Sequence, residues 1–164
     1  MSRAGGRAAV GWGLLPVEYA TVVAALTWPL AAHLRTQIPA TGLGGRFDSL
    51  LVAWALAWQS CALVTALWTW AQGNIFHPAS ATPFYGEAGF GALPYFAPVF
   101  LVTGNPALAL NVTLLAGVVL TALALHWVAW RWTGTHVAEA VAAWTFLCTR
   151  WVLWGWLPSA PSYA

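Results

Sequence analysis

Four acidic side chains are all that the 164-residue chain contains, and two of them could do chemistry. Asp48 follows a glycine-rich stretch and precedes a long apolar segment, and Glu87 lies within FYGEAGFG. If both acids lie at the same surface, they could hold a divalent cation such as Mg²⁺ or Mn²⁺ through oxygen ligands, or one could act as a general base. Asp48 and Glu87 are therefore the candidate catalytic residues, and Asp48 is also the candidate metal ligand.

Three further side chains near these acids could bind an anionic group. Arg46 lies two residues before Asp48, Arg35 begins the same loop, and His77 lies in a second loop. A guanidinium binds phosphate through paired N–H donors, so charge complementarity suggests the two arginines as phosphate contacts. Arg46, Arg35 and His77 are the candidate substrate-binding residues, with a plain loop histidine as the alternative for His77.

The acids also have structural explanations. Asp48 could be the N-cap of the helix that follows it, and Glu87 could be an ordinary surface acid. Glu18 and Glu139 lie near the expected ends of helices, where a charge at headgroup level costs little, so neither is a candidate. The histidines lack the i, i+4 spacing of a zinc site and indicate no metal centre.

The composition indicates an integral membrane protein. Of the residues, 60% are apolar and 6% are charged, against roughly a quarter charged in soluble domains. A net charge of +2 is too small to hold a nucleic acid by its phosphates, and the high apolar content excludes intrinsic disorder. Because the apolar runs lack the alternation of barrel strands, the fold is predicted to be all-α.

About three helices are expected to cross the bilayer, since a span needs about 20 mostly apolar residues. They are 17–34, 107–130 and 137–157, in a single membrane domain over 17–157 with tails at 1–16 and 158–164. Arginines at positions 3, 7 and 131 place the N-terminal tail in the cytoplasm by the positive-inside rule. A secretory signal peptide is the alternative for the first apolar segment.

A long extracytoplasmic loop, 35–106, is expected between the first two spans. Residues 35–47 and 72–91 are rich in Gly, Pro and polar residues and are predicted to be loops. Residues 92–102 are apolar but short and broken by two prolines, which favours an interfacial or re-entrant helix.

Segment 49–71 leaves the topology open. It is apolar and rich in tryptophan, so it suits either a helix lying in the headgroup region or a further span. Three spans and five spans both satisfy the charge pattern, because no arginine lies between Arg46 and Arg131.

Several stretches resemble the N-terminal part of bacterial GT-C glycosyltransferase-like membrane proteins. They are the loop into Asp48, LLVAWALAW at 50–58, NIFHP at 74–78, FYGEAGFGALPYFAP at 84–98 and GNPALALN at 104–111, and the likeness extends over residues 17–146. This resemblance implies a first transmembrane helix, a long extracytoplasmic loop with interfacial helices, and further spans in the cytoplasmic membrane. It favours the three-span topology.

The resemblance also implies a reaction. In GT-C enzymes an acid early in the first loop serves as catalytic base or metal-linked acid, and a polyprenyl-phosphate sugar is the usual donor. By position Asp48 matches that acid, and Glu87 is a second acid in the same loop. Family members have many more helices, and TRWVLWGWLPSAPSYA at the C-terminus differs from their continuation. The chain is therefore expected to be a fragment without activity of its own.

Two other functions stay open from the sequence. A non-enzymatic assembly partner or scaffold would use Asp48 as a helix cap and the tryptophans as interfacial anchors. A transporter or channel subunit would need ionisable residues within its spans, and Arg150 is the candidate for that role.

Overall fold

The protein is helical throughout the residues that the structure describes. This computed structural model describes residues 4–39, 42–76, 78–85, 89–149 and 152. Within these ranges there are five α-helices and no strand, which confirms the all-α prediction. The helices are α1 (Ala4–Leu26), α2 (Gly42–Thr65), α3 (Leu93–Thr103), α4 (Pro106–Thr133) and α5 (His136–Leu147), with short 3₁₀ turns η1 (Leu30–Ala32), η2 (Leu67–Thr69) and η3 (Thr82–Phe84).

The chain divides into two compact units. The terminal unit contains the described residues of 4–31 and 114–152, and the central unit contains those of 32–113. Helix α4 begins in the central unit and belongs to the terminal unit from Leu114 onward.

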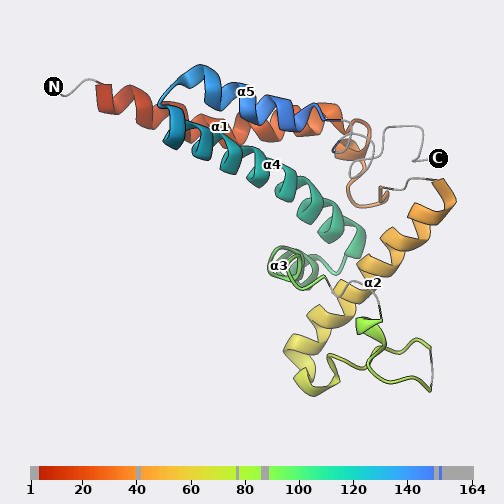
Figure 1. The fold of residues 1–164 in the computed structure, drawn as a ribbon. Helices are drawn as coiled ribbons and strands as arrows, with labels where there is room; N and C mark the ends of the chain where they lie inside the picture. Colours follow the sequence, from red (N-terminus) through yellow and green to blue (C-terminus); the bar gives the residue numbers. More distant parts are fainter. Residues whose placement is uncertain (1–3, 40–41, 77, 86–88, 150–151, 153–164) are drawn as a thin grey trace. The chain divides into compact units, whose positions relative to one another are not determined.

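Helices α1, α4 and α5 share one core in the terminal unit (Figure 1). All three helices contribute to its buried side chains, which are Tyr19, Val23, Val118, Ala122, Ala143, Leu147 and Val152. Ala122 and Ala143 are fully buried, and such small side chains allow helix backbones to approach closely.

A two-residue connection turns the chain from α4 into α5. Gly134 has a φ of +65°, and its N–H donates to the carbonyl of Trp130 at 2.8 Å, which ends α4. Helix α5 then runs from His136 to Leu147, and the Cys148 N–H bonds back to Trp144 at 3.0 Å. Helix α5 therefore covers the first part of the predicted helix over 137–157, of which residues 150–151 and 153–157 lie outside the described residues.

Helix α1 ends earlier than predicted. A single helix was expected over 17–34, but α1 stops at Leu26, shortly before Trp28 and Pro29. Proline has no N–H to donate, and the residue before it is disfavoured in helical geometry. The chain turns instead through Thr27, whose carbonyl accepts the Leu30 N–H at 2.8 Å.

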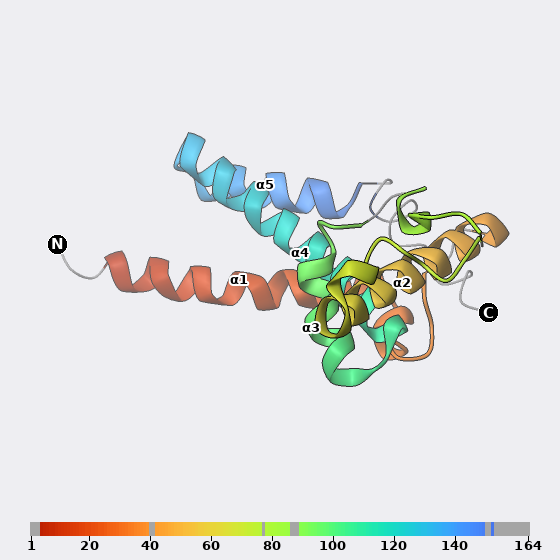
Figure 2. The same ribbon diagram turned by 90° about the horizontal axis from the view of Figure 1, so that it is seen from below.

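In the central unit, α3 packs against α2 (Figure 2). Its buried residues, Leu93, Phe96 and Ala97, have the i, i+3, i+4 spacing of one helix face. The glycine-rich segment expected as a loop over 35–47 is helical from Gly42, so tertiary context here overrides the low helix propensity of glycine.

Two asparagines attach the segment after η1 to the start of α4. Asn105 caps α4, since its Oδ1 accepts the Leu108 N–H at 2.9 Å, and its Nδ2 donates to the Arg35 carbonyl at 3.0 Å. The fully buried Asn111 donates to the carbonyls of Leu34 and Gln37 at 2.8 and 2.6 Å. These bonds position the segment that leads toward α2.

Two helical stretches among the described residues are long and apolar enough to cross a membrane, namely Phe47–Thr65 within α2 and Pro106–Thr133. The second corresponds to the predicted span 107–130, and the first falls within segment 49–71, whose role was open. Of the other two predicted spans, 17–34 is helical in α1 as far as Leu26, and 137–157 is helical in α5 as far as Leu147, with residues 150–151 and 153–157 outside the described residues. Gly13–Leu26 counts as a shorter apolar helix, and α5 has 12 residues, or about 18 Å.

Candidate functional site

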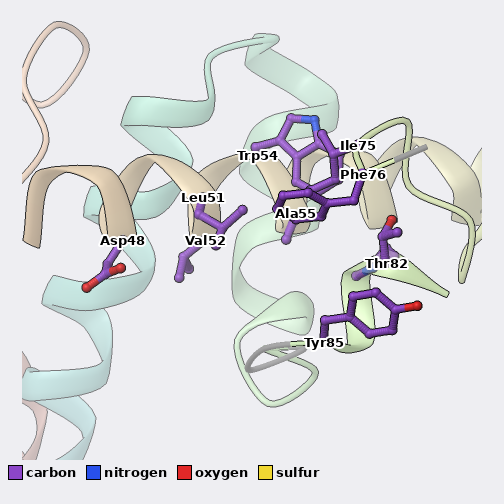
Figure 3. Close-up of a pocket in the computed structure, with 10 residues that line it drawn as sticks. Asp48, Leu51, Val52, Trp54, Ala55, Ile75, Phe76, Thr82 and Tyr85 are labelled. Atoms are coloured by element: carbon purple, nitrogen blue, oxygen red, sulfur yellow. The ribbon is translucent and has the colours of Figure 1, made fainter. Parts of the chain in front are cut away.

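A pocket of about 800 Å³ lies beside α2 in the central unit (Figure 3). One wall is α2 itself, and the facing wall is the loop between η2 and α3. Its lining is largely apolar and consists of Asp48, Leu51, Val52, Trp54, Ala55, Ile75, Phe76, Thr82, Pro83 and Tyr85. The volume falls in the range of about 300–1,000 Å³ that is usual for ligand sites.

Asp48 begins the α2 wall of this pocket. Asp48, Leu51, Val52 and Ala55 have the i, i+3, i+4, i+7 spacing of one helix face. In Figure 3 the Asp48 carboxylate lies at one end of this row, and Thr82 and Tyr85 lie toward the other end. The Asp48 side chain is exposed, so the carboxylate is accessible to a ligand in the pocket.

The helix-cap explanation for Asp48 is wrong. Helix α2 begins at Gly42, so Asp48 lies inside the helix, beyond the backbone N–H groups that a cap would satisfy. The next residue, Ser49, donates its hydroxyl to the Pro39 carbonyl at 2.7 Å. The scaffold hypothesis explained Asp48 as a helix cap, and the structure does not support that explanation.

An aromatic cluster holds the loop that forms the facing wall. The ring of Trp70 lies 5.8 Å from that of Phe84 and 4.8 Å from that of Phe90, and the two phenylalanines lie 5.6 Å apart. These centroid distances are typical of favourable aromatic pairs. The cluster closes the loop between η2 and α3 and so fixes the pocket residues that it carries.

At Gly73 this loop lies against Trp54 of α2. A Cβ at this position would lie 2.7 Å from Trp54 Cη2 and 2.8 Å from Thr82 Oγ1. The Gly73 carbonyl also accepts the Thr82 hydroxyl at 3.3 Å. A side chain at this position would therefore require Trp54 and Thr82 to move.

Replacing Gly73 by alanine is expected to displace Trp54 and Thr82, both of which line the pocket, and to cost about 1–3 kcal/mol of stability through overpacking. The measurement is a denaturant titration of wild type and variant in the same detergent. Gly91→Ala is the matched control, because nothing lies within 4 Å of a Cβ at Gly91. Equal losses for the two variants would contradict the close approach at Gly73.

The other predicted site residues are placed only in part. Arg35 is exposed and does not line the pocket, and its backbone carbonyl is bound by Asn105. Arg46 lies in α2 two positions before Asp48, in a stretch whose side chains lie outside the description. His77 and Glu87 also lie outside the described residues. Of the five predicted site residues, the structure therefore assigns Asp48 to the pocket.

A metal role for Asp48 stays a prediction. Across the ranges that the structure describes, no three His, Cys, Asp or Glu side chains are grouped as ligands for a metal ion. Glu87, the second acid expected in the same loop as Asp48, lies outside the described ranges.

The terminal unit contains a polar cluster that the sequence interpretation missed. The Tyr19 hydroxyl and His126 Nδ1 lie 2.7 Å apart, and His126 Nε2 lies 3.4 Å from Glu139 Oε2. The other oxygen of Glu139 is hydrogen-bonded to Nδ1 of His136. The i, i+3 spacing of His136 and Glu139 was visible in the sequence, and Glu139 had been set aside as a headgroup-level acid.

No family model matches the chain, and neither a curated protein nor a solved structure matches it. Function is therefore inferred from the chain's own residues, above all from the carboxylate at the apolar pocket.

Proposed function

We propose that the chain is part of a GT-C-like membrane glycosyltransferase, an enzyme that transfers a sugar from a polyprenyl-phosphate donor. The observation that carries this proposal is the position of Asp48, an exposed carboxylate at the end of an apolar pocket. Such a donor combines a long apolar chain with a charged phosphate and a sugar. The apolar groove is suited to the prenyl chain, and the acid at its end is suited to accept the proton of a hydroxyl that attacks the sugar.

The apolar lining supports a prenyl chain as the bound group. Leu51, Val52 and Trp54 line one wall, and Ile75 and Phe76 lie on the other. Each buried CH₂ of a ligand contributes about 0.8 kcal/mol. Several isoprene units in a pocket of about 800 Å³ would therefore give substantial affinity.

Asp48 is the proposed general base. Its carboxylate takes the proton of the acceptor hydroxyl as the hydroxyl oxygen attacks the anomeric carbon of the donor. The bond from that carbon to the phosphate oxygen breaks, and polyprenyl phosphate leaves with the electron pair. Glu87 is the proposed second acid. Arg46 and Arg35 are the proposed contacts to the phosphate, and His77 is a proposed contact to a polar headgroup. A divalent cation such as Mg²⁺ or Mn²⁺ would stabilise the leaving group.

The uncovered surfaces of the two long apolar helices support a membrane location. In each candidate span only 33% of the most apolar window is buried within the protein. Exposed large apolar side chains on these helices include Leu51, Leu63, Val64, Leu120 and Trp127. A lipid bilayer would cover these surfaces. The proposed location is a bacterial cytoplasmic membrane, with several spans, a cytoplasmic N-terminus and the pocket on the outer side.

Val52→Trp is expected to lower donor binding by at least roughly tenfold, because the indole fills the apolar part of the pocket. The measurement uses the full chain in nanodiscs and a polyprenyl-phosphate sugar with a diazirine in the prenyl chain. Photocrosslinking is quantified against donor concentration, and the labelled peptides are identified by mass spectrometry. Labels are expected on the segments around Val52 and Phe76.

Val64→Trp is the matched control, since Val64 lies on the same helix, is 65% exposed and does not line the pocket. It should bind the donor like the wild type. Equal labelling of Val52→Trp and wild type would show that the donor does not occupy this pocket. The non-enzymatic scaffold would then be the better hypothesis.

A further inference from the structure

Four polar side chains form a continuous chain through the terminal unit. It runs from Tyr19 on α1 to His126 on α4, then to Glu139 and His136 on α5. The two carboxylate oxygens of Glu139 face different imidazoles, with Oε1 toward His136 and Oε2 toward His126. These four side chains thereby link all three helices of this unit.

The exposed fraction of the side chain changes sharply from one end of this row of four polar residues to the other. Tyr19 is 1% exposed and Glu139 5%, whereas the side chain of His136 is 88% exposed. Glu139 Oε2 is buried and has no hydrogen bond, and the His126 ring nitrogen lies 3.4 Å away. A buried carboxylate is costly unless a positive charge or hydrogen bonds compensate it. One proton shared by the two imidazoles would supply that charge.

The order hydroxyl, imidazole, carboxylate is also that of a nucleophile activated by a base. Tyr19 is too deeply buried for a substrate to reach its hydroxyl. A proton needs no open path to the core, because it can enter at the exposed ring of His136 and pass to Glu139 along the hydrogen bond between them. The ligand that fits this cluster is therefore a proton.

We propose that Glu139, His126 and His136 form a proton-binding site whose occupancy sets how firmly α5 is held against α1 and α4. The groups facing Glu139 are His126 from α4 and His136 from α5, with Tyr19 of α1 behind His126. The other charged side chains described on these helices, Glu18 on α1 and Arg131 on α4, are exposed. Loss of the shared proton removes the positive charge beside the Glu139 carboxylate and leaves only neutral hydrogen-bond donors, so α5 loosens as pH rises. This site does not depend on the proposed transferase function.

The test is hydrogen exchange of the full chain in nanodiscs between about pH 6 and about pH 9, across which imidazole loses its proton. Exchange rates are corrected for their intrinsic dependence on pH. Amides of α5 in the wild type are expected to lose protection by roughly tenfold or more at the higher pH. In Glu139→Gln the buried charge is absent, and the protection of α5 should change by less than about twofold.

Glu18→Gln is the matched control, because it removes an exposed acid next to Tyr19 and should leave the pH response of α5 intact. If Glu139→Gln does not fold, His136→Asn decides, since it changes only an exposed ring. It should lower α5 protection at about pH 6, because one of the two imidazoles that compensate Glu139 is lost. Wild-type protection that is independent of pH, an unaltered response in Glu139→Gln, or wild-type protection in His136→Asn would overturn the proposal.

Discussion

In the full-length enzyme of which this chain is proposed to be a part, replacing Asp48 by asparagine is expected to lower the rate of sugar transfer about 10²–10⁴-fold and to leave donor binding nearly unchanged. The amide keeps the size of the side chain but cannot take the proton of the acceptor hydroxyl. The cost to stability should be small, because Asp48 is exposed and lies inside α2 rather than at its cap. The measurement follows release of radiolabelled sugar from a polyprenyl-phosphate donor in proteoliposomes, with kcat and KM determined separately.

Glu18→Gln makes the same chemical change at an exposed acid of the terminal unit, so it should retain the wild-type rate. A wild-type rate for Asp48→Asn would remove Asp48 from the catalytic residues. Donor binding without any transfer by the wild type would restrict the chain to holding the donor, and the pocket would then be a binding site that is completed elsewhere.

The best-predicted element of the fold is the one whose limits are marked locally. Helix α4 was expected over 107–130 and extends over Pro106–Thr133. Its start is fixed by the Asn105 cap with proline in the first helical position, and its end by Gly134. These signals can be read from neighbouring residues alone.

The predicted limits that were wrong were read from the average composition of a segment and not from local signals. Apolar residues continue beyond Leu26, and this hydropathy suggested a helix up to residue 34 although Pro29 lies within it. The glycines before Asp48 suggested a loop, whereas α2 already begins at Gly42. In the first segment average hydropathy was given more weight than the proline that decides the backbone geometry, and in the second the low helix propensity of glycine was given more weight than tertiary context.

The pocket at Asp48 could be predicted in part from the sequence, whereas the polar cluster around Glu139 could not. Asp48 was accessible to reasoning because acids are rare in this chain, and its pocket neighbours on α2 follow at helical spacing. The Tyr19 and His126 pair joins residues 107 positions apart. Such a pairing depends on how α1 and α4 pack, and a single sequence does not contain it. The sequence alone therefore indicates only an acid at headgroup level near a helix end for Glu139.

Phe96→Ala is expected to lower the free energy of unfolding by about 3–5 kcal/mol, the range for removing a fully buried phenylalanine side chain. Phe96 is 0% exposed on α3, the helix that packs against α2, and its ring lies 5.6 Å from that of Phe100. The substitution removes these contacts and leaves a cavity. The measurement is a denaturant titration in detergent micelles, followed by far-UV circular dichroism.

Tyr95→Ala is the matched control, because Tyr95 is the preceding residue on α3 and is 50% exposed. Tyr95→Ala should lower the free energy of unfolding by about 1 kcal/mol or less. The comparison also tests what covers α3, since lipid can solvate an uncovered apolar surface about as well as another helix does. A loss for Phe96→Ala as small as that for Tyr95→Ala would mean that packing on α2 contributes little. Helix α3 would then be held mainly by its connections to the chain, as expected for a helix lying at the membrane surface.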